Sequence, residues 1–160
     1  MKRENLAVLA GFLAHQQDVI NRLTAEIGAT APDSREKTSH LGYLLHNLYG
    51  ALEDLFQEIV RTFENRLEDP GRYHRELLKR MALEIPGVRP PLLSAGGHTL
   101  LNELRGFRHV FRHAYDYELS PRRLSDLKAR LLENWPQVHQ DITVFAEFLN
   151  KALLSCPSDK

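Results

Sequence analysis

Hydrophobic residues recur every three to four positions along most of the chain, a spacing that predicts amphipathic helices. The first such segment, Glu4 to Ile27, predicts a helix that ends at Gly28. A continuous stripe of large apolar residues then predicts a long helix from about Glu36 or Ser39 to Leu67. That stripe is wide enough to face more than one neighbour. A shorter helical segment is expected from Arg72 to Glu84.

Prolines and glycines mark the remaining boundaries. The segment Ile85–Pro91 is expected to be a loop, because its three prolines do not fit a helix interior. The next helix is expected to end near Glu118, and Ser120-Pro121 is a good start for the last one, with Ser120 as cap and Pro121 in the first turn. Trp135-Pro136 lies inside that last helix and predicts a kink or a short break.

No segment alternates apolar and polar residues as a strand does. The fold class is therefore predicted to be all-α, an antiparallel bundle of four long helices plus one short helix. A single domain is expected over residues 1–154, followed by a disordered tail at 155–160. A chain of 160 residues is long enough to bury a substantial core.

Composition narrows the function classes only slightly. Lys+Arg and Asp+Glu are equal at 21 each, so any anion binding must come from a local cluster of charges. The single Cys156 excludes an internal disulfide framework and a cysteine-based zinc site. No long apolar run is present, so we expect no signal peptide, no membrane span and a cytoplasmic location.

The segment from Leu100 to Tyr117 carries the strongest chemical signal. On a helical wheel its apolar residues fall on one arc, as an ordinary core stripe does. The opposite arc carries guanidinium and imidazole groups, which bind phosphate and move protons. This cationic face consists of Arg105, Arg108, His109, Arg112 and His113, together with Asp116.

Within this face, Arg108 and His113 form an Arg-x4-His pattern. A guanidinium holds a phosphate by paired hydrogen bonds, and an imidazole takes and returns a proton, so the pair suits RNA cleavage without a metal. Five residues on a helix turn through about 140°, so the two side chains diverge in one copy. Two copies facing across a two-fold axis can supply both groups to one substrate.

Two simpler possibilities stand beside this one. His109 and His113 are four residues apart, but no third ligand is evident and three arginines repel a cation, so we expect no metal and no cofactor. An Arg/His-rich helix face is also compatible with an ordinary salt-bridged surface. The residues alone therefore establish only a cationic helix face that is competent to bind phosphate.

The segment from Arg108 to Tyr115 resembles the R-x4-6-H motif of the HEPN superfamily, and more narrowly the R-x4-H-x-Y form of HepT-type toxins. The segment His46–Glu53 resembles the H-N-x-Y-x-x-x-E pattern in the long helix of HepT-like proteins, and Tyr73–Ala82 is similar to a HepT-like subgroup. The resemblance covers the chain from about Leu6 to Leu153. It implies a HEPN-like helical bundle.

The resemblance also implies a function. HepT-type toxins are ribonucleases paired with an MntA-type nucleotidyltransferase antitoxin, and both the RNA substrate and a homodimer are expected here. Arg108 would bind the scissile phosphate and His113 would act as general acid and base. Tyr115 matches the tyrosine that the antitoxin modifies with AMP. His109 stands where the family commonly has asparagine or another polar residue. This departure bears on the rate or the substrate register, although a second imidazole is compatible with RNA cleavage.

Arg105 and Arg112, with His109, are the candidates for further contacts to phosphate or RNA. The alternative from a different class is a non-catalytic HEPN scaffold that binds or orients a nucleotidyltransferase, with the cationic face as its docking surface. The two hypotheses differ on whether His113→Ala abolishes RNA cleavage. His46, Asn47 and Tyr49 are interpreted as core or interface packing residues with satisfied polar tips, in preference to a catalytic role. His74 follows no pattern that indicates a role.

Overall fold

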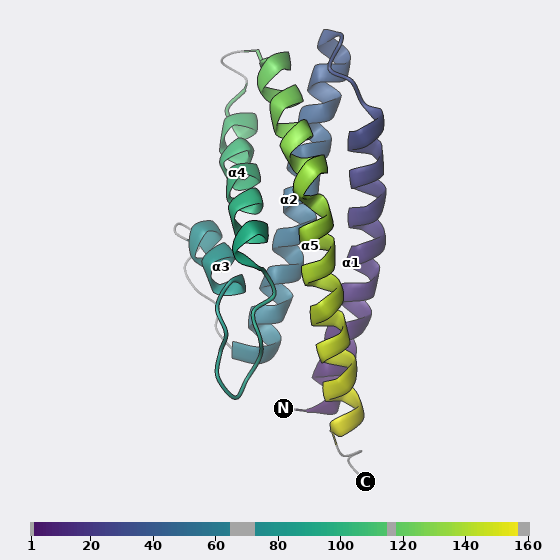
Figure 1. Cartoon of the computed structure of the whole chain (residues 1–160), viewed down its shortest axis with the longest axis vertical. Coiled ribbons are helices and arrows are strands. Elements are labelled where there is room, and N and C mark those ends of the chain that lie inside the picture. Colours follow the sequence, from purple (N-terminus) through teal and green to yellow (C-terminus); the bar gives the residue numbers. More distant parts are fainter. Residues whose placement is uncertain (1, 65–72, 115–117, 157–160) are drawn as a thin grey trace.

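The computed structural model describes residues 2–64, 73–114 and 118–156, and these form five α-helices and no strand. The helices are α1 (Arg3–Ala29), α2 (Arg35–Glu64), α3 (Tyr73–Met81), α4 (Ala95–Arg112) and α5 (Pro121–Ser155). The four long helices alternate in direction, and α3 lies on one side of the bundle (Figure 1). The predicted all-α bundle of four long helices and one short helix is confirmed. None of the helices in the described part of the chain has the length and apolar character needed to span a membrane.

Helix α2 is the centre of the bundle. It packs against α1, α3, α4 and α5, whereas α1 contacts only α2 and α5 among the described helices. The wide apolar stripe predicted for this helix is therefore buried on several sides, and each fully buried leucine stabilises the fold by about 1.5–3 kcal/mol relative to an exposed one. Its completely buried apolar residues are Leu41, Leu45, Leu48, Leu52, Leu55, Phe56 and Ile59.

The predicted end of the first helix was close to the observed one, and the second helix begins slightly before the predicted Glu36 or Ser39. Helix α1 ends at Ala29, one residue beyond the predicted Gly28. Helix α2 begins at Arg35, because Ser34 caps it: the Ser34 hydroxyl accepts a hydrogen bond from the amide of Lys37 at 3.2 Å. The predicted end of this helix at Leu67 lies outside the described residues.

Helix α4 ends at Arg112, so the prediction that it continues to near Glu118 was wrong. The amides of His113 and Ala114 bond to carbonyls three residues back, at 3.3 and 3.2 Å, which is the tighter turn that often closes a helix. Beyond the turn, Leu119 packs against the core before α5 begins. The apolar stripe of α4 did not reveal this tertiary contact.

Helix α5 runs without interruption through Pro136, so the predicted short break is absent. A proline in a helix leaves the carbonyl four residues earlier without its partner. Both Pro136 and Leu132 are exposed, so water can hydrate that carbonyl. The predicted start is confirmed, since the Ser120 hydroxyl accepts a hydrogen bond from the amide of Arg123 at 3.3 Å. The helix includes Ser155, the first residue of the predicted tail, and residues 157–160 lie outside the described part.

The loop between α3 and α4 is organised by a buried arginine. The side chain of Arg89 is fully buried, and it donates to Glu64 Oε1 at the end of α2 from Nη2 at 2.6 Å and from Nε at 3.1 Å. It also donates to the carbonyls of Arg80, Leu83 and Pro90, each at 3.2 Å. This one side chain therefore ties the end of α3 to the end of α2.

Candidate functional site

The candidate site is built on the C-terminal half of α4, where this helix packs against α2 and α3. The start of α4 is fixed by Ser94, whose hydroxyl accepts a hydrogen bond from the amide of Gly97 at 3.1 Å. Asp141 on α5 accepts hydrogen bonds from the Ser94 amide and hydroxyl at 2.9 and 2.8 Å. Because the cap is tied to α5, the orientation of α4 and of the side chains along it is set by the bundle.

Arg108 points from α4 toward a carboxylate on α2 and an imidazole on α3. Its Nη1 lies 3.2 Å from His74 Nε2, and its Nη2 lies 4.0 Å from Glu53 Oε1. His74 Nδ1 in turn lies 2.7 Å from Glu53 Oε2. The side chains of Glu53, Arg108 and His74 are 8%, 21% and 34% exposed. Side-chain exposure in this Glu53–His74–Arg108 cluster therefore increases from the buried carboxylate to the partly exposed imidazole.

The partners of His74 determine where its proton lies. A guanidinium has no acceptor, so His74 Nε2 must accept from Arg108 and must itself be unprotonated. The proton of the neutral ring is then on Nδ1, where it donates to the Glu53 carboxylate. In this state a negatively charged carboxylate faces a neutral imidazole and a positive guanidinium. A carboxylate that accepts from Nδ1 also stabilises the imidazolium that forms when Nε2 takes a proton.

Two further polar residues of α2 line the same region. The ring of His46 lies against Phe111 of α4, with ring centroids 5.0 Å apart, and its Nδ1 is buried without a hydrogen-bond partner among the described residues. Burial lowers the pKa of His46, and the positive charges of Arg108 and Arg112 lower it further. Tyr49 is completely buried, and burial together with the Glu53 charge raises the pKa of its phenol. Both side chains are therefore held uncharged beside the cluster.

His113 lies at the C-terminal cap of α4, exposed to solvent. Its Nδ1–H donates to the carbonyl of His109 at 2.9 Å, and the two imidazole rings are 4.5 Å apart between centroids. Arg108 instead faces Glu53 and His74. The described contacts of the two motif residues therefore lie in different directions, as the helical wheel predicted.

The other predicted cations lie around this face. Arg105 donates to the side-chain oxygen of Asn102 from Nε and Nη2 at 3.1 and 3.0 Å. Arg112 is exposed and close enough to His46 to lower its pKa. Tyr115, the predicted site of modification, lies outside the described residues. Within the described part of the chain, no group of three or more His, Cys, Asp or Glu side chains is arranged to hold a metal ion.

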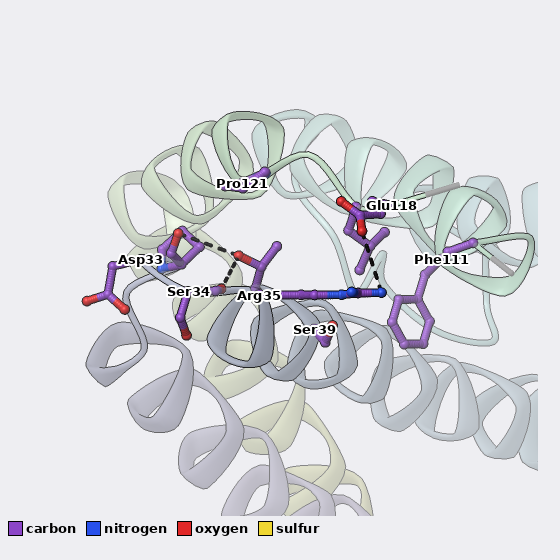
Figure 2. A pocket seen from close by; sticks show the side chains of 11 residues that line it. Asp33, Ser34, Arg35, Ser39, Phe111, Glu118 and Pro121 are labelled. Carbon is purple, nitrogen blue, oxygen red and sulfur yellow. Dashed lines mark hydrogen bonds and ion pairs between the residues drawn. The ribbon is translucent and has the colours of Figure 1, made fainter. Parts of the chain in front are cut away.

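A surface pocket of about 500 Å³ adjoins the end of α4. Figure 2 shows the Arg35 side chain extending from the start of α2 beside Phe111 toward Glu118, with which it forms an ion pair of 3.5 Å. The pocket is also lined by Ala114 and Leu119. Both partners of the ion pair are largely exposed, so the pair contributes little to the stability of the pocket.

Sequence reasoning missed the partners of Arg108. Glu53 appeared only within a family pattern, and His46 was interpreted as a packing residue. A signal was nevertheless present: His46, Tyr49 and Glu53 are polar or hydroxylated residues at i, i+3 and i+7 of a helix otherwise lined with leucine. Such a set on one face of a core helix indicates a buried polar site. His74 carried no comparable signal, because only the packing of α3 on α2 and α4 brings it to Arg108.

Comparison with protein families gives a match to the family described as HepT-like protein over residues 40–149. The matched region contains Glu53, His74, Arg108 and His113, and it covers more than half of the chain. Comparison with curated proteins and with solved structures gave no match. The family match agrees with the helical bundle and with the resemblance of the α2 and α4 motifs, and the chain belongs to the HepT-like family.

Proposed function

We propose that this chain is an endoribonuclease toxin that acts in the cytoplasm and cleaves RNA without a metal ion. The observation that carries the proposal is the Glu53–His74–Arg108 cluster, in which a buried carboxylate holds the motif guanidinium at a partly exposed surface. Membership of the HepT-like family supports the same class. The exposed His113 at the end of α4 supplies an imidazole for proton transfer.

The proposed reaction is an internal transesterification. The ribose 2′-oxygen attacks the adjacent phosphorus while its proton passes to a base, and the bond from phosphorus to the 5′-oxygen breaks. The leaving 5′-oxygen takes a proton from an acid, which leaves a 2′,3′-cyclic phosphate and a 5′-hydroxyl. Arg108 stabilises the negative charge that develops on the phosphorane, and His113 takes part in the proton transfers.

The site is proposed to be completed by two copies of the chain. In one copy, Arg108 faces α2 and α3, whereas His113 faces His109 at the helix end. A two-fold axis that brings two such faces together would set Arg108 of one copy opposite His113 of the other. The exposed Arg112 and His109, with Arg105, would add positive charge along the RNA path.

We further propose that an MntA-type nucleotidyltransferase antitoxin silences this site through Tyr115. The tyrosine hydroxyl would attack the α-phosphate of ATP, which releases pyrophosphate and leaves AMP on the oxygen. The added phosphate is negative and the added nucleoside is bulky, so both would obstruct phosphate binding by arginines that lie a few residues away in the sequence, such as Arg112. Incubation with the antitoxin and ATP should add one AMP to wild type and none to Tyr115→Phe, as read by mass spectrometry.

One observation favours the alternative of a non-catalytic scaffold. Arg108 is already engaged by Glu53 and His74, an arrangement that also suits a structural ion-pair network. In that case the cationic face would bind a nucleotidyltransferase partner and no RNA would be cleaved. The scaffold predicts that Arg108→Ala weakens partner binding and that RNA remains intact with wild type.

The test is incubation of purified protein with RNA in EDTA. Wild type is expected to cleave, and Arg108→Ala and His113→Ala are each expected to lower the rate by about 10²-fold or more. His139→Ala, which removes an exposed histidine of α5, is the matched control and should cleave as wild type does. Intact RNA after incubation with folded wild type would overturn the proposal.

A further inference from the structure

The proposed reaction requires two proton transfers at different oxygen atoms, and the motif supplies one imidazole. A second imidazole lies within the Glu53–His74–Arg108 cluster of the same copy. We propose that His74 is the general base that takes the proton from the ribose 2′-hydroxyl, an inference that rests on the proposed ribonuclease function. His113 then serves as the acid that protonates the leaving 5′-oxygen.

The geometry places His74 where a base is needed. Its Nε2 lies 3.2 Å from a guanidinium nitrogen of Arg108. The attacking 2′-hydroxyl and the oxygens of the scissile phosphate are neighbours in the substrate, so a phosphate bound to Arg108 brings this hydroxyl close to Nε2. In the complex, the substrate hydroxyl takes the place of the Arg108 N–H that now donates to His74 Nε2. Arg108 has five N–H donors, so its guanidinium is then able to bind the phosphate oxygens.

The protonation state of His74 also suits a base. Its Nε2 is the unprotonated nitrogen, because the Arg108 guanidinium can only donate to it. Its Nδ1–H donates to Glu53 at 2.7 Å, which fixes the ring orientation. The imidazole is about one-third exposed, so substrate can reach it, whereas Glu53 is nearly buried and its charge is little screened by solvent.

The proton balance follows from these contacts. His74 Nε2 takes the proton of the 2′-hydroxyl as the 2′-oxygen bonds to phosphorus, and the resulting imidazolium is stabilised by the Glu53 carboxylate. His113, as an imidazolium, gives its Nε2 proton to the 5′-oxygen as the bond between that oxygen and phosphorus breaks, and it keeps the Nδ1–H that donates to the His109 carbonyl. Glu53 touches no substrate atom in this scheme and acts as a positioning residue through His74.

The deciding experiment compares two RNA substrates in EDTA: ordinary RNA, and RNA that carries sulfur in place of the 5′-oxygen at the linkage that wild type cleaves. A thiolate leaves without protonation, so this substrate needs a base but no acid. With ordinary RNA, His74→Ala and His113→Ala should each lose about 10²-fold or more in rate. With the sulfur substrate, His113→Ala should recover most of the wild-type rate and His74→Ala should not.

Each outcome decides between the claims. A His74→Ala rate within threefold of wild type would overturn the role of His74 and leave the ribonuclease function standing. Recovery of the cleavage rate of His74→Ala on the sulfur substrate would also overturn the role of His74 as base, since it would show that His74 acts as the acid. Absence of cleavage by wild type would overturn both proposals.

Two further variants separate catalysis from folding. His74→Gln keeps a side chain that hydrogen-bonds but cannot take a proton at neutral pH, so it should lose activity like His74→Ala while unfolding at the wild-type temperature. In a His74→Ala background, Glu53→Gln should lower the rate less than it does in wild type, because the part of its effect that acts through His74 is already lost and only its contact with Arg108 remains. An equal loss in both backgrounds would contradict the positioning role.

Discussion

Arg89 offers the sharpest test of how the site is held in place. Its side chain is fully buried and donates to Glu64, whose side chain is 9% exposed, and to three backbone carbonyls at the end of α3 and in the following loop. Arg89→Ala would remove all of these donors at once. Among the described residues, the variant would leave this buried carboxylate with one partner, Arg80, whose Nε lies 3.4 Å from the other carboxylate oxygen.

The magnitude follows from this remaining partner. Removing one member of a buried ion pair costs about 3–5 kcal/mol, and the Arg80 contact places Arg89→Ala near the lower end, at about 3 kcal/mol. For a domain of this size that loss corresponds to a decrease of about 6–12 °C in the unfolding temperature. Because Arg89 anchors the end of α3, the helix that carries His74, RNA cleavage is expected to decrease as well.

The chain provides a matched control on its surface. Arg130 and Glu103 form an ion pair with the same closest distance, 2.6 Å, but their side chains are 51% and 40% exposed. Arg130→Ala should therefore cost less than about 1 kcal/mol. Urea unfolding followed by far-UV circular dichroism gives both values. If Arg89→Ala lost no more unfolding free energy than Arg130→Ala, the argument from burial would be refuted.

Two further predictions concern the start of α4 and the charge state of His46. Gly97→Ala should destabilise the fold by about 1–2 kcal/mol in urea unfolding. The added methyl group would collide with the Asp141 carboxylate, which ties the Ser94 cap to α5. An unchanged free energy of unfolding would contradict this prediction. The pKa of His46 is lowered in the folded state, so the unfolded chain binds its proton first as the pH falls below about 6.5. Wild type should therefore lose stability relative to His46→Gln as the pH falls below that value, and parallel curves of unfolding free energy against pH would show that His46 does not contribute.

The sequence predicts the bundle well, because its main determinants are local. The apolar stripe of α2 is continuous over eight turns and is buried as expected. The Ser120 cap and Pro121 in the first turn of α5 are also local signals, and the structure has both. Pro136 shows the limit of such signals, since an exposed helix side tolerates a proline that a buried one would not.

The site was less predictable, because it depends on contacts between distant segments. Arg108 was identified from its motif, but its partners Glu53 and His74 are separated from it by 55 and 34 positions in the sequence. The end of α4 was misplaced because it was placed by the start signal of the next helix, Ser120-Pro121, whereas the helix already closes with a tighter turn at His113 and Ala114. The burial of Arg89 had no sequence signal, since it lies in a proline-rich loop where arginine is usually exposed.

The central claim is that Arg108 of one copy and His113 of another complete one ribonuclease site. It is tested most directly by mixing Arg108→Ala with His113→Ala, each nearly inactive alone, under conditions that exchange subunits. Half of the resulting dimers are mixed, and each mixed dimer holds one complete site of two. The account predicts that RNA cleavage in EDTA recovers to about a quarter of the wild-type rate. A mixture no more active than the two variants measured separately would contradict it.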